Sequence, residues 1–67
     1  MNKPNTFDAT HMNNSVLDRL LARYRRDLAQ NNAEILNSDN ATAVMLRELN
    51  VILNARIAAI FAEQLSR

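Results

Sequence analysis

The sequence predicts an all-α fold, an antiparallel hairpin of two helices, from three observations. The chain has 67 residues with no Gly and one Pro, so it lacks the residues that tight β-hairpins need at positive φ. Apolar residues recur at helical spacing in two long stretches from residue 17 onward. Between these stretches lie four consecutive turn-forming residues, Asn37-Ser38-Asp39-Asn40. A short loop between two long helices makes them antiparallel neighbours.

Residues 1–13 are predicted to form a flexible N-terminal tail, which is followed by the hairpin at residues 14–67. This segment is rich in Asn and Thr, contains the only Pro and shows no apolar period. The run Thr10-His11-Met12 is also compatible with a cloning junction or an alternative start. With His11 the only His and no Cys in the chain, we expect no metal site and no disulfide.

The first helix is predicted over about residues 15–35. Ser15 and Asp18 form an S-x-x-D capping signal at its start. Asn31 and Asn32 weaken the helical pattern, so we expect the helix to end between Asn31 and Leu36. Its apolar residues fall within an arc of roughly 100°. They are Leu17, Leu20, Leu21, Tyr24, Leu28 and Ile35.

The second helix is predicted over about residues 39–65, with Ser38 or Asp39 as its N-cap. One apolar series on this helix, which includes Met45 and Ile52, spans roughly 140° of the circumference. We predict that five residues of each helix form the hairpin core. These are Leu17, Leu20, Leu21, Tyr24 and Leu28 of the first helix, and Leu46, Leu49, Leu53, Ile57 and Ile60 of the second.

A second apolar series on the same helix repeats every seven residues on nearly the opposite side. One apolar stripe is enough to pack against one helix, so two stripes indicate burial on more than one side. A small chain without disulfides or metal commonly gains stability by association. We therefore expect another chain to cover this side, although either series is a possible internal seam. The predicted partner-binding residues are Val44, Val51, Ala58, Phe61 and Leu65.

Three arginines, Arg19, Arg23 and Arg26, share the solvent face of the first helix. Arginines are common phosphate contacts. However, acidic residues lie among them, with Arg23 and Asp27 spaced as an i,i+4 pair, and no aromatic residues are interleaved for base stacking. We interpret this side as an ordinary solvated face.

Polar residues inside the helices have two interpretations. One of Asn31, Asn50 and Asn54 is a candidate for fixing the register of an interface by hydrogen bonding. For Asn50 and Asn54 the sequence favours solvent exposure. Arg56 falls within the main apolar series. We expect its stem to lie along the seam with the charge in water, in preference to a pair with a partner carboxylate.

The sequence predicts a protein that is not an enzyme and uses no cofactor. It contains no Gly-rich phosphate loop, no Cys, no second His and no pair of acids on one apolar helix face. A net charge of +1 provides no overall attraction to nucleic acid or anionic lipid. No apolar run approaches the roughly 20 residues that span a bilayer, and no apolar stretch follows Lys3 as in a signal peptide. A cytoplasmic location is expected.

The run Leu21-Ala22-Arg23-Tyr24-Arg25-Arg26-Asp27-Leu28-Ala29 has the form L-A-x-x-R-R-[DE]-L-A. With the polar turn and the long, Ile- and Ala-rich second helix, it resembles the small co-chaperones of type III secretion needle subunits, the YscE, PscE and EscE-like proteins. The likeness covers about residues 17–65. The long N-terminal segment and residues 37–40 depart from the family pattern.

The resemblance implies a bacterial, cytoplasmic helical hairpin. Such a protein binds a tetratricopeptide-like chaperone, and the pair keeps the needle subunit soluble and unpolymerised. Three alternatives stay open. The first is a needle or rod subunit, although residues 37–40 lack the Pro that is usual in the turn of such subunits. The second is a self-associating adaptor or regulator that forms a four-helix dimer. The third is a small nucleic-acid-binding regulator.

Overall fold

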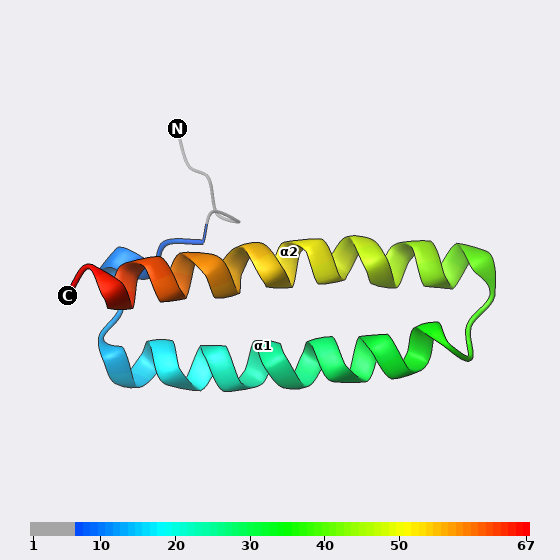
Figure 1. Ribbon diagram of the computed structural model, residues 1–67, viewed down its shortest axis with the longest axis horizontal. Helices are drawn as coiled ribbons and strands as arrows, with labels where there is room; N and C mark the ends of the chain where they lie inside the picture. Colours follow the sequence, from blue (N-terminus) through cyan, green and yellow to red (C-terminus); the bar gives the residue numbers. More distant parts are fainter. Residues whose placement is uncertain (1–6) are drawn as a thin grey trace.

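The computed structural model describes residues 7–67 and shows the predicted hairpin. A short 3-10 helix, η1 (Ala9–His11), precedes two long helices, α1 (Asn14–Ile35) and α2 (Asn40–Leu65). The two long helices run antiparallel in a single layer (Figure 1). The all-α class and the hairpin are thus confirmed, and each helix begins one residue away from its predicted start.

The cap of α1 is Asn13, so the prediction of Ser15 as the cap was wrong. The Asn13 backbone is extended, and its Oδ1 accepts a hydrogen bond of 2.9 Å from the Val16 amide. Ser15 therefore lies inside the first turn. Asp18, the second residue of the predicted capping signal, instead accepts a 2.7 Å hydrogen bond from the side chain of Gln64. This bond ties the start of α1 to the end of α2.

Side chains close the loop between the helices. The Ser38 hydroxyl donates a 2.6 Å hydrogen bond to the Glu34 carbonyl at the end of α1. Asp39 caps α2 by accepting a 2.8 Å hydrogen bond from the Thr42 amide. It is one of the two N-cap residues that the sequence predicted. Hydrogen bonds from the Thr42 backbone and side chain lower the pKa of the Asp39 carboxyl. No residue from 7 to 67 has a positive φ, so the turn needs no Gly.

The seam between the helices contains nearly all of the predicted core. Leu17 and Ile60 are fully buried. Leu49 was predicted inside but is 48% exposed, because α1 covers a narrower arc of α2 than the 140° apolar series spans. Ala43, which was not predicted, is buried. The other predicted core residues are buried (Leu21, Tyr24, Leu46) or half-buried (Leu20, Leu28, Leu53, Ile57).

Three asparagines connect the helices in the half of the hairpin nearer the loop. The Asn31 amide donates to Asn50 Oδ1, and the Asn50 amide donates to Asn32 Oδ1, both at 3.0 Å. The preference for solvent exposure of Asn50 was therefore wrong, since its side chain is half-buried and bonded to α1. A slip of either helix would break both bonds, so this network specifies the register. Asn54 is exposed, as expected.

The N-terminal segment differs from the prediction of a tail through residue 13. Residues 1–6 of that tail lie outside the described residues. From Phe7 onward the chain packs on the hairpin, with Ala9 buried in the core cluster and Phe7 and Met12 against it. These apolar residues cover the end of the seam where Leu17 and Ile60 meet.

Arg67 holds this segment in place. Its guanidinium donates to the carbonyl oxygens of Met12 and Ala9, the latter at 3.3 Å, and to the Asn14 side chain at 3.0 Å. It also forms an ion pair of 3.0 Å with Glu63, one turn earlier in α2. Arg67, which follows α2, therefore binds the backbone at the first residue of η1 and directly after η1.

Candidate partner-binding surface

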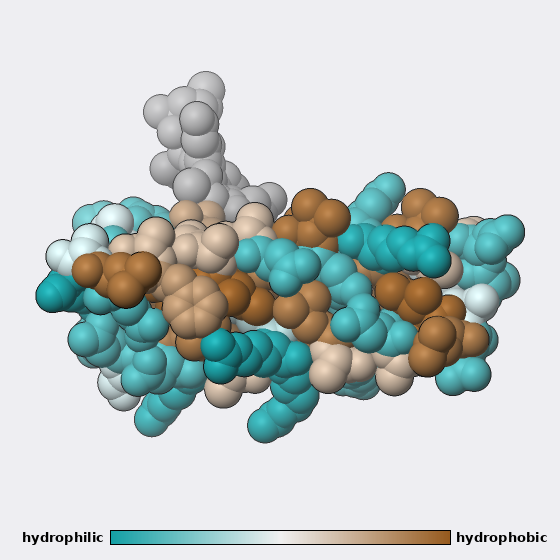
Figure 2. Space-filling model, in the orientation of Figure 1, coloured by the Kyte–Doolittle hydropathy of each residue, from teal (hydrophilic) through white to brown (hydrophobic). Residues whose placement is uncertain are grey.

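The side of α2 that faces away from α1 is apolar and open to solvent. Val51 is 68% exposed and Leu65 is 87% exposed. Apolar surface is visible at several points along α2 (Figure 2). The structure thus leaves the predicted partner-binding series uncovered by the hairpin itself. We call Val44, Val51, Ala58 and Leu65, all of them exposed, the outer face of α2.

Phe61 was grouped with the outer face in the sequence prediction, but it lies on a flank of α2. The guanidinium carbon of Arg25 on α1 lies 5.5 Å from the centroid of its ring. This is a cation–π distance, and it places Phe61 beside the seam. The ring is still partly open to solvent, so it borders the outer face on the Arg25 side.

A second group of exposed apolar residues lies on the opposite flank of α2 and was missed. Met45 is 63% exposed, and Leu49 and Ile52 are about half exposed. The sequence assigned them to the inner series because 140° of apolar surface was taken as one stripe. The width of the series could have revealed this group, since packing against a single helix needs an apolar stripe of only about 100°.

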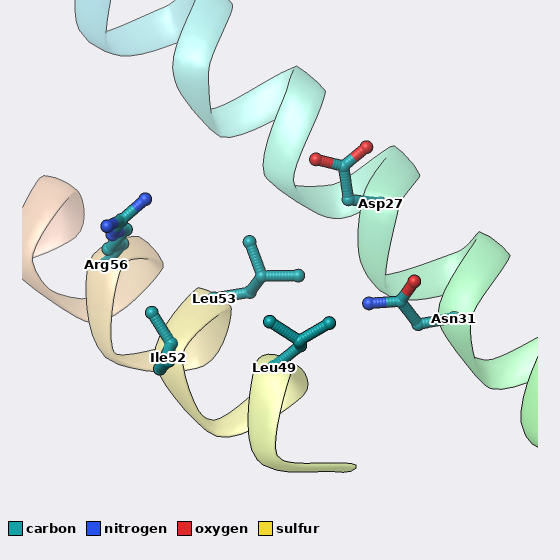
Figure 3. Close-up of a pocket in the computed structure, with 6 residues that line it drawn as sticks. All are labelled: Asp27, Asn31, Leu49, Ile52, Leu53 and Arg56. Carbon is teal, nitrogen blue, oxygen red and sulfur yellow. The ribbon is translucent and has the colours of Figure 1, made fainter. Parts of the chain in front are cut away.

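An open hollow of about 380 Å³ lies between this flank and α1 (Figure 3). Asp27 and Asn31 reach it from α1, and Leu49, Ile52, Leu53 and Arg56 from α2. The hollow has one carboxylate and no second acid or His at its walls. It provides apolar contact area without a set of groups suited to acid–base chemistry.

Arg56 interacts with two aromatic rings. Its guanidinium carbon lies 5.7 Å from the ring centroid of Phe7 and 5.8 Å from that of Tyr24. The two rings meet edge to face, with centroids 6.2 Å apart. Arg56 is half-buried, and its guanidinium lies against these two rings, whereas the sequence predicted that the charge would point into water. The contact with Phe7 was missed, because residue 7 was assigned to a tail.

The arginine face of α1 is solvated, as predicted, with Arg19, Arg23 and Arg26 exposed. Arg23 and Asp27, which have i,i+4 spacing, do not form an ion pair. Within residues 7–67 Glu63 and Arg67 form an ion pair, and His11 Nε2 lies 3.2 Å from the Asp8 carboxylate.

Chemistry-bearing side chains are sparse in the part of the chain that the structure describes. Across residues 7–67 no group of three His, Cys, Asp or Glu residues is close enough to bind a metal ion. No polar or charged side chain in that range is buried. Neither α1 nor α2 has a stretch that is both long and apolar enough to cross a bilayer.

Comparison with protein-family models, with curated proteins and with solved structures finds no match to this chain. The exposed apolar residues of α2 are therefore the feature of the molecule that points to a function.

Proposed function

We propose that this chain is a non-catalytic binding protein whose α2 helix packs against another helical protein. In its specific form, the proposal is a type III secretion co-chaperone. The hairpin would bind a tetratricopeptide-like chaperone, and the pair would keep a needle subunit soluble and unpolymerised in the bacterial cytoplasm. The motif resemblance over residues 17–65 supports this specific form.

The observation that carries the proposal is the apolar surface of α2 outside the seam. Val51 and Leu65 on the outer face, and Met45 on the flank, are each more than half exposed. Exposed apolar surface that extends along one helix is typical of an interaction site. A groove or helix of another protein would remove this surface from water, which favours association.

The experiment is co-expression of the chain with the tetratricopeptide-like chaperone and the needle subunit of a type III secretion system from the same organism. We expect the three proteins to co-purify. The Val51→Asp variant should lose the complex, because it places a charge at the centre of the outer face. The matched control is Ala22→Asp, which adds the same charge at an exposed position of α1.

The results separate the parts of the proposal. If the wild-type chain does not co-purify with these proteins, the co-chaperone role is wrong. If V51D and a charged substitution at Ala58 leave the complex intact, the outer face is not the binding surface. Far-UV circular dichroism of both variants checks that the hairpin is folded, which we expect because Val51 makes no core contact.

A further inference from the structure

The exposed side of α2 contains a longer repeat than its four outer-face residues. Glu48, Ala55 and Ala62 lie between successive outer-face residues, and Ala41 lies about one turn before Val44; all four are exposed. When these residues and the outer face are taken together in sequence order, the spacing between neighbours alternates strictly between three and four residues. This is the heptad spacing of a coiled-coil seam. The outer repeat is Ala41, Val44, Glu48, Val51, Ala55, Ala58, Ala62 and Leu65.

We infer that the outer repeat pairs with the outer repeat of a second copy of this chain. The two α2 helices would be antiparallel about a two-fold axis that crosses the interface midway between Val51 and Ala55. Such an axis brings the same surface of both copies together, so the surface must be complementary to itself. Side-chain size and the flanking residues of α2 meet this requirement, and the charge of Glu48 disfavours the parallel alternative.

Side-chain size is complementary in the antiparallel arrangement. The axis places Leu65 opposite Ala41, Val44 opposite Ala62, and Val51 opposite Ala55. Each bulky residue therefore meets a small one, which lets facing layers interdigitate without a void or a clash. In a parallel pair, identical residues would face each other, and three successive layers, at Ala55, Ala58 and Ala62, would contain only alanines.

The charge of Glu48 selects the same direction. In a parallel pair, Glu48 would face Glu48 of the second copy inside the seam, which is unfavourable for like charges. In the antiparallel pair, Glu48 faces Ala58, and the two glutamates lie at separate places along the interface.

The residues beside the outer repeat are also self-complementary. On one flank, the axis places Ile52 opposite Ile52 and Met45 opposite Ala59, so apolar residues meet apolar residues. On the other flank, Asn54 faces Asn54, and Arg47 faces Phe61. Paired amides and an arginine over an aromatic ring are both favourable contacts. The pairing would thus bring Met45 and Ile52 of the exposed flank against the second copy.

This pairing goes beyond the proposed function, because it concerns the form of the free chain. The helical partner of the proposed function would have to displace the second copy from the same surface. A monomeric chain that still binds its partner would overturn the pairing alone. A dimer that does not bind the proposed partners would overturn the proposed function alone.

Cysteine cross-linking of the full chain tests the arrangement, since the sequence contains no Cys. Val44→Cys and Ala62→Cys are prepared as separate variants, mixed and oxidised. We expect a disulfide-linked dimer from the mixture and little from either variant alone, because the two residues at position 44 would lie about 27 Å apart along the helices. Ala22→Cys on α1, mixed with A62C, is the matched control and should remain uncross-linked.

Light scattering after size exclusion of the wild-type chain, over a dilution series, completes the test. We expect the mass of two chains, and the mass of one chain for Val51→Asp with helix content retained. The mass of one chain for the wild type at every concentration would overturn the inference. Efficient cross-linking of V44C with itself would also overturn it, because that result requires a parallel pair.

Discussion

A comparison of alanine substitutions on the two sides of α2 tests which side packs inside the hairpin. Ile60 is fully buried against the cluster that contains Leu17, Leu21 and Tyr24. Val51 is 68% exposed and lies outside that cluster. Both substitutions shorten an aliphatic side chain on the same helix, so the difference between them reports burial rather than helix propensity.

The magnitudes follow from the burial of each side chain. Truncation of a buried Ile to Ala removes about 2–5 kcal/mol, from lost transfer free energy and the cavity that remains. A core of this size rarely supplies more than about 3–5 kcal/mol. Ile60→Ala should therefore remove most of the stability of the hairpin. Val51→Ala should change the free energy of unfolding of a single chain by less than about 0.5 kcal/mol.

The assay is urea unfolding followed by far-UV circular dichroism at several protein concentrations. We expect the loss for I60A at every concentration. A loss for V51A should appear only at concentrations at which two chains associate, because association adds its own stabilisation to the folded state. Equal losses for the two variants in dilute, monomeric protein would refute the assigned orientation of α2.

Three further outcomes follow from single contacts. Asn13→Ala removes the cap of α1 and should lower stability by about 1 kcal/mol, whereas Asn13→Ser should restore most of it, as measured by urea unfolding. Arg67→Ala removes the donor to the Met12 carbonyl and should shift the NMR signals of residues 7–12 toward random-coil values while those of α1 and α2 persist. The pKa of Asp39 is lower in the folded chain than in the unfolded chain. The ionised carboxylate therefore stabilises the hairpin fully at pH values above the unfolded pKa. This contribution to stability is lost as the pH falls through the folded pKa. Asp39→Asn retains a cap that does not titrate, so its melting temperature should fall less than that of the wild type on acidification.

The hairpin could be predicted because its determinants are local in the sequence. Helical spacing of apolar residues and a cluster of turn residues fix two helices and one loop, whatever else the chain contacts. Residue spacing alone does not predict that Asn13, and not Ser15, caps α1. Both residues have suitable side chains, and only the backbone conformation before the helix decides between them.

The parts that could not be predicted depend on how closely two helices approach and on distant contacts. The exposure of Leu49 depends on how much of α2 a single helix covers, and the burial of Asn50 depends on the register of α1. Phe7, Ala9 and Met12 have no period of their own and pack only because the other end of the chain lies beside them. The exposed positions of the outer face were anticipated, but a partner's identity is determined by the partner's sequence as well.

The contact between Met12 and Arg67 also constrains the order of folding. The two residues are 55 positions apart, whereas the capping bonds of α1 and α2 span three positions each. Local contacts close with little loss of chain entropy, and distant ones close late. Residues 7–12 should therefore dock after the two helices have paired. Until then, the end of the seam at Leu17 is open to water, and the hairpin is most vulnerable to proteases at that end.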